Sequence, residues 1–466
     1  MDTLSTPWRG DGDLVQMLSA LSPSALKVAE SQCTKPVARS QSPEALRETL
    51  ALSLPVQGRP LEEVLAATVE VVSAAPVTAG PAFFNQLFSG RGAAAIFAEM
   101  LSGLANHSMY TFKLAGPMVI IEALLIEKMS APVGYGQSGG VFCTGGSLSN
   151  LVAILCARDR VVPAAKEEGL PQRLRIYSSA ESHYSIRKGA NIAGIGRGNV
   201  VSVPVDGLGR MCPDALRVAI EADLHAGARP MMINGTAGTT VRGAFDPMQA
   251  LAELAEEFGL WFHIDGAFGG SALWSPELKP LLEGAARADS FTWDAHKAMG
   301  VPLTCSVLLT RDPVSASRAL REGADYLFQG DTDALNPGLR SLQCGRRNDA
   351  LKLWAAWQHF GDEGWRRRLE RQRGLALALA QRIEVNPALI LSEPPHFLTV
   401  CFEYPGRSSA SICEALQQKQ RALIGYGQVK GREVIRAAVM DPQLTTADLD
   451  ALVDAVIEVA VDAEPS

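Results

Sequence analysis

The sequence predicts an α/β protein in which a large domain with a mostly parallel central sheet is followed by a smaller C-terminal α+β domain. Between about residues 140 and 310, short apolar runs alternate with helical segments, a pattern typical of successive βαβ units. Beyond about residue 340, long helical patterns surround a few strand-like runs. The length of 466 residues also exceeds what one hydrophobic core usually holds. We expect a helical N-terminal arm over residues 1–80, the large domain over 81–340 and the small domain over 341–466.

The elements are expected in the following order. Proline and serine separate short helical patterns in the arm, among them "PEALRETLALSL" and "LEEVLAATVEVV". The strands of the large domain are expected at "LRIYSSA", "VVSVPV", "MMINGT", "LWFHID" and "SVLLT". In the small domain, helices such as "DALKLWAAWQHF" and "ADLDALVDAVIEVAV" accompany the strands "FLTVCFEY" and "EVIRAAVM".

One helix of the large domain can be delimited closely. Asp246 is a favourable N-cap, Pro247 suits the first turn, and Gly259 can adopt the left-handed conformation that ends a helix. The strand "LWFHID" follows at once, so Asp265 is expected at the carboxyl end of a strand. Open α/β sheets bind their ligands at that edge. Lys297, which follows "SFTWDAH", is expected at the same edge.

Composition disfavours several classes of function. The net charge of −7 argues against nucleic acid binding, and the arginine-rich "WRRRLERQR" at 365–373 is interpreted as a solvated helix face. The eight cysteines form no CxxC pair, so we expect reduced thiols in a cytoplasmic protein and no metal site. The first residues lack the pattern of a secretory signal. The most apolar window, 118–129, is too short and too charged to span a bilayer, which favours a helix at a core or subunit contact.

The stretch "FCTGGSLSN" contains the parts of an anion site. Gly145 and Gly146 allow close approach of a ligand to the backbone, Ser147 supplies a hydroxyl, and the helix that follows presents free N–H groups. The stretch matches neither of the usual nucleotide-binding fingerprints. Taken alone, the pattern is also that of an ordinary turn.

Three further side chains are expected near sheet edges. His183 comes just after "LRIYSSA", and Asp265 ends "LWFHID". Lys297 lies in the apolar stretch "FTWDAHKAMGVPLTCS", where desolvation lowers the pKa of a lysine and makes its neutral amine a nucleophile. Each has an ordinary alternative: a structural histidine, a capping carboxylate, and a lysine whose ammonium stays in water.

Taken with the anion site, these side chains are the parts needed to hold pyridoxal phosphate. Asp265 would keep the pyridine nitrogen protonated, so that the ring accepts electrons. His183 would stack on the face of the ring, and Lys297 would form a Schiff base with the aldehyde.

Eight ordered motifs resemble the group II pyridoxal-phosphate decarboxylases, in particular the branch of glutamate and cysteine sulfinate decarboxylases. The resemblance covers roughly residues 80 to 460 and rests on "FFNQLFSG", "GGSLSN", "ESHYSIRKGANIAGIG", "GTAGTTVRGAFDP", "HIDGAFGG", "DAHKAMGVPLTCS", "DYLFQGD" and "QCGRRNDALKLWAAW". It implies fold type I, similar to aspartate aminotransferase, and a homodimer with active sites at the subunit interface. It also implies that Lys297 carries the cofactor. Around the phosphate it places Gly146, Ser147, Ser290 and His296. Around the ring it places Thr236, Ala267 and Asp265.

Two features depart from the family pattern. Many relatives have Asn-Pro or Asp-Pro before the His-Lys pair, whereas this chain has Asp294 and Ala295, which is expected to alter the rigidity of the turn more than the chemistry. Residues 1–75 do not resemble the family closely enough to be aligned, so their contribution to a dimer stays open.

The resemblance implies loss of CO2 from an amino acid, followed by protonation of the substrate at Cα. The family's proton donor is a tyrosine on a mobile loop, matched here by Tyr326 in "DYLFQGD". Relatives with phenylalanine at this position tend toward oxidative chemistry that gives aldehydes. The ordinary alternative for Tyr326 is a loop aromatic packed on a neighbour.

The expected substrate is a short acidic amino acid such as cysteine sulfinate, cysteate or aspartate. Arg436 in "REVIRAAVM" matches the family's substrate-anion arginine, and a guanidinium binds carboxylate or sulfinate oxygens in pairs. Gln86 matches an amide donor of acid-specific relatives. Phe88 and Ser108 resemble the cysteine sulfinate branch more than the glutamate branch.

Alternatives remain open. The chain could decarboxylate glutamate, 2,4-diaminobutyrate or an unusual biosynthetic amino acid, although Arg436 would repel a diamine. An aminotransferase on the same fold would release no CO2. A catalytically silent binding protein is disfavoured because Lys297, Asp265, His183 and Tyr326 are all present.

Overall fold

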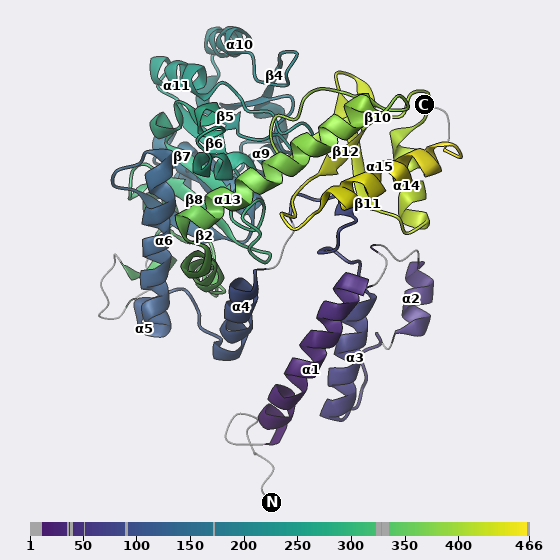
Figure 1. Ribbon diagram of the computed structural model, residues 1–466. Coiled ribbons are helices and arrows are strands. Elements are labelled where there is room, and N and C mark those ends of the chain that lie inside the picture. Colours follow the sequence, from purple (N-terminus) through teal and green to yellow (C-terminus); the bar gives the residue numbers. More distant parts are fainter. Residues whose placement is uncertain are drawn as a thin grey trace, which may run out of the picture.

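The N-terminal helices stand apart from the rest of the molecule in the computed structural model, which describes residues 12–34, 37, 41–50, 52–88, 92–170, 173–322, 328 and 335–463 (Figure 1). They are α1 (Gly12–Thr34), α2 (Pro43–Thr49) and α3 (Leu61–Ala74). Helices α1 and α3 lie side by side and project away from the two sheets (Figure 1). The described part of residues 1–80 therefore contains helices, as the sequence predicts, whereas the division of this segment as a separate arm stays a prediction.

The large sheet has seven strands in the order β2-β8-β7-β6-β5-β3-β4. Their bounds are β2 (Gly139–Cys143), β3 (Leu174–Ser179), β4 (Val200–Val203), β5 (Arg229–Thr236), β6 (Trp261–Asp265), β7 (Ser290–Asp294) and β8 (Ser306–Thr310). All neighbours are parallel except β8, which runs antiparallel to both β2 and β7. The reason lies in the short connection 295–305, since parallel strands need a longer crossover. The predicted, mostly parallel sheet is confirmed.

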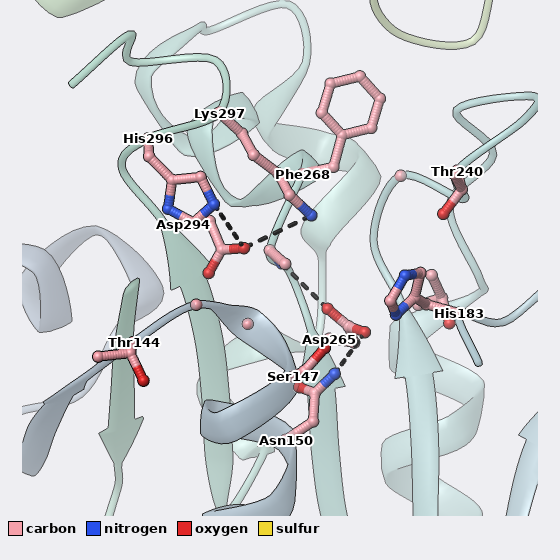
Figure 2. A pocket seen from close by; sticks show the side chains of 15 residues that line it. Thr144, Ser147, Asn150, His183, Thr240, Asp265, Phe268, Asp294, His296 and Lys297 are labelled. Atoms are coloured by element: carbon pink, nitrogen blue, oxygen red, sulfur yellow. Dashed lines mark hydrogen bonds and ion pairs between the residues drawn. The ribbon is translucent and has the colours of Figure 1, made fainter. Parts of the chain in front are cut away.

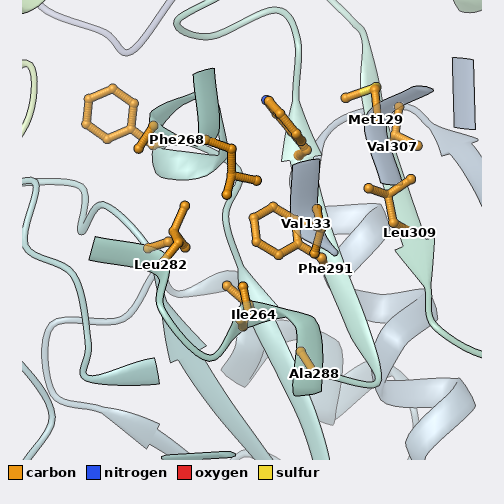
Figure 3. Close-up of a cluster of buried hydrophobic side chains, with 14 of the residues drawn as sticks. Met129, Val133, Ile264, Phe268, Leu282, Ala288, Phe291, Val307 and Leu309 are labelled. Atoms are coloured by element: carbon orange, nitrogen blue, oxygen red, sulfur yellow. The ribbon is translucent and has the colours of Figure 1, made fainter. Parts of the chain in front are cut away.

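Helices cover both faces of this sheet, so the large domain has three layers. One face carries α7 (Gly146–Val161), α9 (Ser185–Ile192) and α12 (Ser315–Leu320), and the other α6 (Pro117–Val133), α10 (Pro213–His225) and α11 (Met248–Glu257). Side chains alternate along each strand. On β8, Val307 and Leu309 join the cluster with Phe291 and Met129 that Figure 3 shows, whereas Leu308 joins the opposite cluster.

The start of α11 differs from the sequence prediction. Helix α11 has Pro247 at its N-cap position, with no side-chain capping bond. The carboxylate of Asp246 instead accepts the backbone N–H groups of Met211 and Thr236, both at 2.7 Å. Burial raises the pKa of Asp246 to about 7, against the effect of those two bonds. The N-cap prediction was wrong because a tertiary contact uses the side chain, whereas the left-handed Gly259 (φ 66°) is confirmed.

The small sheet has the order β1-β11-β12-β10-β9. Its strands are β1 (Phe83–Phe84), β9 (Ile390–Leu391), β10 (Thr399–Glu403), β11 (Leu423–Val429) and β12 (Arg432–Ala438), and its helices are α14 (Ser409–Gln418) and α15 (Thr446–Ala460). Strand β1 pairs in parallel with β11, so a segment from the predicted large domain extends the C-terminal sheet. The exact division into domains stays a prediction.

The long helix α13 (Asp349–Val385) connects the two sheets and runs diagonally across Figure 1. Its arginine-rich stretch is only partly a solvated face. Arg366 and Arg367 pair with Glu363 at the surface. Arg368 donates to the carbonyl oxygen of Ala298 at 2.9 Å, and Arg373 donates to two carbonyls of 395–397. The interpretation as a solvated face was therefore wrong for these two arginines, because the connection after β7 and the segment before β10 pack against that side of α13.

The remaining helices near the large sheet are α4 (Ala93–Ala105), α5 (Phe112–Ala115) and α8 (Ala165–Glu168). Within the described ranges, no helix is long and apolar enough to cross a lipid bilayer.

Candidate functional site

A cavity of about 260 Å³ opens at the carboxyl ends of β5, β6 and β7, beside the start of α7 (Figure 2). Most of the residues predicted to hold a cofactor line it: Gly145, Gly146, Ser147, His183, Thr236, Asp265, Ala267, His296 and Lys297. Sequence reasoning missed other lining residues: Thr144, Asn150, Gly238, Thr240, Phe268 and Asp294. The edge of the sheet predicted from the strand pattern is thus where these side chains meet.

The start of α7 forms one wall of the cavity. Gly145 precedes the helix with φ 95°, a conformation that favours glycine, and no side chain of the described chain caps this end. A Cβ atom on Gly146 would lie 2.7 Å from Oδ2 of Asp294 and 3.2 Å from Cβ of Ala267. A side chain at position 146 would therefore require the carboxylate of Asp294 to shift. The free N–H groups of the first turn face an open space suited to a phosphate.

Asp265 lies at the end of β6, close to Asn150 of α7 (Figure 2), with only 5% of its surface exposed. Its Oδ2 accepts a hydrogen bond from the side-chain amide of Asn150 at 2.8 Å, and its Oδ1 accepts the N–H of Ala267 at 3.2 Å. These donors stabilise an ionised carboxylate. Such a carboxylate is what a protonated pyridine nitrogen requires as a partner.

A chain of buried hydrogen bonds, which runs from Trp261 through Ser290 and His263, ends at Asn150. Trp261 can only donate, so Ser290 accepts its Nε1–H at 2.8 Å and turns its own hydroxyl proton toward Nδ1 of His263, also at 2.8 Å. Nε2 of His263 then donates to Oδ1 of Asn150 at 3.1 Å. Burial lowers the pKa of His263 to about 4, so its ring is neutral at pH 7. This fixes the orientation of the Asn150 amide toward Asp265.

The same bonds overturn the prediction for Ser290. The resemblance places Ser290 near the phosphate, but the structure places it at the first residue of β7, fully buried, with its hydroxyl engaged by Trp261 and His263. The cavity lies at the other end of β7, where Asp294 lines it. Ser290 therefore supports the site only through His263 and Asn150.

Lys297 points its amine into the cavity from the connection after β7 (Figure 2). Its side chain is 22% exposed, so the amine is less buried than the apolar sequence around it suggests. Nζ lies 3.5 Å from Oδ2 of Asp294, and Nε2 of His296 lies at the same distance from that oxygen. Nδ1 of His296 lies 2.9 Å from the carbonyl oxygen of Cys305, which holds the ring in place.

His183 and Thr236 lie on another side of the cavity. Burial lowers the pKa of His183, which favours a neutral ring at the cavity wall. Its Nδ1 accepts the N–H of Ser185 at 3.3 Å. The hydroxyl of Thr236 is 2.9 Å from that of Ser182. The cavity therefore has a partner for each part of pyridoxal phosphate. The start of α7 suits the phosphate, and Asp265 suits the pyridine nitrogen. The ring of His183 suits the face of the cofactor, and the amine of Lys297 suits its aldehyde.

The predicted substrate residues lie outside the lining of this cavity. Arg436 is 8% exposed, which excludes the ordinary alternative of an exposed arginine. Its Nη1 donates to the carbonyl oxygen of Asn85 at 2.7 Å, whereas Nε and Nη2 are buried with no hydrogen-bond partner among the described residues. Burial lowers its pKa. Gln86 is the exposed residue next to Asn85.

Arg436 lies on the face of the small sheet that meets the cavity wall. It is opposite Cys401 on the neighbouring strand, so both side chains share one face. The thiol of Cys401 donates to the carbonyl oxygen of Val241 at 3.3 Å, and Val241 adjoins the lining residue Thr240. The structure thus brings Arg436 toward the wall that contains Thr240.

The other predicted residues are less closely connected. Phe88 packs on Phe83, with ring centroids 5.6 Å apart. Ser108 is half-buried between α4 and α5. Tyr326 lies outside the described residues.

The loop 238–243 that forms part of the cavity wall is fixed by a buried ion pair. Nε of Arg242 donates to Glu393 at 2.6 Å, and Nη2 donates to the carbonyl oxygen of Gly207 at 2.9 Å. Burial alone would raise the pKa of Glu393, but the neighbouring His396 and the hydrogen bonds from Arg242 outweigh it and lower the pKa to about 2. This Arg242–Glu393 pair joins the large domain to the segment before β10.

Comparison with known proteins agrees with this geometry. The family described as "Pyridoxal-dependent decarboxylase conserved domain" matches residues 43–405. Cysteine sulfinic acid decarboxylase of Mus musculus is 38% identical over 437 residues, which cover 88% of each chain. Acidic amino acid decarboxylase GADL1 of Bos taurus is 34% identical, over 88% of this chain and 84% of its own. A crystal structure of mouse CSAD superposes with a TM-score of 0.92 at 34% identity, covering 96% of this chain and 99% of that one.

Proposed function

The chain belongs to the pyridoxal-dependent decarboxylases, and from that premise we propose that it removes the α-carboxylate of a short acidic L-amino acid such as cysteine sulfinate, cysteate or aspartate. Its cofactor is pyridoxal 5′-phosphate, which supplies the electron sink for loss of CO2. The single observation that carries the proposal is the buried guanidinium of Arg436, with two N–H-bearing atoms unpaired among the described residues.

We assign a separate role toward the cofactor or the substrate to each of the following residues. The start of α7 holds the phosphate through backbone N–H groups and Ser147. Asp265 holds the proton on the pyridine nitrogen, and Asn150 orients Asp265. Lys297 presents its amine to the aldehyde carbon. His183 offers the face of a neutral ring. We assign delivery of the proton to Cα to Tyr326, on the family resemblance alone.

The acidic side chain of the substrate is assigned to Arg436. A buried guanidinium with unpaired donors is costly unless an anion binds it, and carboxylate or sulfinate oxygens match its geometry. The relatives named above for cysteine sulfinic acid and for acidic amino acids support the same class of substrate. Gln86 adds an amide donor next to Asn85, the residue that already accepts from Arg436. A diamine would meet like charge at this position.

A decarboxylation screen tests the substrate class. We expect kcat/KM for cysteine sulfinate, cysteate and aspartate to exceed that for aromatic and basic amino acids by about a hundredfold or more. CO2 release is the measurement, because an aminotransferase would give none. A preference for tyrosine, histidine or diaminobutyrate would contradict the acidic assignment while leaving the decarboxylase intact.

The role of Arg436 is tested by Arg436→Met. The variant should raise KM for the acids by about a hundredfold, with a smaller effect on the absorbance of the bound cofactor. Arg432→Met is a matched control on the same strand, because Arg432 is exposed and, among the described residues, forms an ion pair with Glu403 alone. Unchanged turnover of acids by Arg436→Met would remove the assignment.

We further propose a homodimer with its active sites at the subunit interface. Helices α4, α5 and α6 expose large apolar side chains, among them Phe97, Leu104, Leu114, Ile120 and Leu124. Such a patch favours burial by a second copy. Sedimentation at micromolar concentration should give about twice the chain mass of 49.7 kDa. A stable and active monomer would contradict the shared site.

We also propose a reducing compartment such as the cytoplasm. The seven cysteines that the structure describes are all free, and five of them are buried. Thiol titration of protein purified without reductant and then denatured should find all eight cysteines of the chain free.

A further inference from the structure

Asp294 places a carboxylate inside the anion site. It is the last residue of β7, with 2% of its surface exposed, and it lines the same cavity as Gly146 and Ser147. Its Oδ2 approaches the α7 wall so closely that a Cβ on Gly146 would meet it at 2.7 Å. A negative charge therefore adjoins the backbone N–H groups that receive the phosphate.

The carboxylate has only loose partners. Oδ2 lies 3.5 Å from both Nζ of Lys297 and Nε2 of His296, beyond the usual length of a hydrogen bond. Oδ1 is buried and has no hydrogen-bond partner among the described residues. The carboxylate of Asp294 is thus a loosely held counter-ion of Lys297, without a close hydrogen bond among the described residues.

A phosphate that enters this cavity competes with Asp294 for the same positive groups. The phosphate carries close to two negative charges, and the repulsion between unit charges a few ångströms apart remains large where water is excluded. An ionised carboxylate also cannot donate a hydrogen bond to phosphate oxygens. An amide of the same size would remove the repulsion and add a donor.

We propose that Asp294 weakens the hold of the chain on the phosphate group of its cofactor and so promotes exchange of the cofactor with solution. Without the phosphate, Asp294 is the counter-ion of Lys297. With the phosphate, it opposes the ligand. This inference rests on the cofactor of the family and is independent of the substrate assigned through Arg436.

The test compares pyridoxal phosphate with pyridoxal, which lacks the phosphate. Absorbance gives the dissociation constant of each compound for the cofactor-free chain. The ratio of the pyridoxal constant to the pyridoxal phosphate constant measures how much the phosphate group contributes to binding. Any effect of the substitution on the amine of Lys297 changes both constants and cancels in the ratio. We expect Asp294→Asn to raise the ratio about tenfold or more, and to slow release of pyridoxal phosphate.

Two further variants complete the design. Asp294→Ala removes the charge without adding a donor, so it should raise the ratio by less than Asp294→Asn does. Asp312→Asn removes the same charge from an exposed position just after β8 and should leave the ratio unchanged. An unchanged or lower ratio in either Asp294 variant would overturn the proposal, and Asp294→Ala keeps it testable if Asp294→Asn does not fold. A changed acid preference in the Arg436 experiment would not affect this result.

Discussion

Buried charges are arranged differently in the cavity around Lys297 and in the Arg242–Glu393 pair. Arg242 is 2% exposed in its side chain, and its guanidinium meets Glu393 at 2.6 Å and a carbonyl oxygen at 2.9 Å. In the cavity, the carboxylate of Asp294 has no described partner closer than 3.5 Å, and its Oδ1 has no hydrogen-bond partner among the described residues. Complete pairing stabilises the fold, whereas an incompletely paired carboxylate keeps a charge that acts on any ligand entering the cavity.

The comparison predicts opposite consequences of mutation in the two regions. Variants in the cavity should lose activity and keep most of their stability. Variants in the Arg242–Glu393 pair should lose stability and still bind the cofactor as the wild type does. The following experiments test this contrast, in order of decreasing expected effect.

The largest effect is expected for Lys297→Ala. Loss of the amine should lower kcat/KM by roughly four orders of magnitude or more, because the cofactor can no longer be attached and released through it. The denaturation midpoint of the cofactor-free chain should change little. In the wild type, borohydride reduction followed by peptide mapping should place the pyridoxyl group on Lys297. A label on another lysine would refute the assignment.

Asp265→Asn should come next, with turnover lowered by a factor of about 10² to 10³. The amide keeps the shape of the side chain but cannot hold the proton on the pyridine nitrogen. Stability is again expected to be nearly unchanged, which the midpoint of urea unfolding measures. Near-normal turnover would contradict the role assigned to Asp265.

Glu393→Gln is expected to act on stability. It leaves Arg242 buried without its strongest partner, which costs about 3 kcal/mol of unfolding free energy at pH 7. Glu257→Gln is the matched control, because it breaks an exposed pair with Arg217 and should change the denaturation midpoint little. If both variants unfold at the same denaturant concentration, the Arg242–Glu393 pair does not carry the stability proposed for it.

The smallest effect is a dependence of stability on pH. The pKa of Glu393 is lowered in the folded chain from its ordinary value of 4.5 to about 2, so its contribution is complete above pH 4.5 and is lost as the pH falls toward 2. Unfolding free energies measured at pH 5, 4 and 3 should fall more steeply for the wild type than for Glu393→Gln. If the two variants lose stability equally over this pH range, Glu393 has the same pKa in the folded and the unfolded chain.

Local patterns in the sequence determined the elements and the edge of the sheet where chemistry occurs. Apolar runs gave the strands β3 to β6 and β8, because a buried strand must be apolar whatever its neighbours are. The end of such a run placed Asp265, and ordered motifs placed Lys297 and His183 in the same cavity. Glycine at 259 indicated a helix end because few other residues adopt φ 66° at low cost.

The partners of polar side chains were decided only by the tertiary structure. Asp246 binds distant backbone groups and does not cap α11, Ser290 supports His263 and not a phosphate, and Arg368 holds the carbonyl oxygen of Ala298. Asn150 and Asp265 are 115 residues apart in the chain, yet their hydrogen bond orients the carboxylate of Asp265 in the cavity. A side chain in a packed interior takes whichever donor or acceptor the fold brings within about 3 Å, and no local pattern specifies that choice.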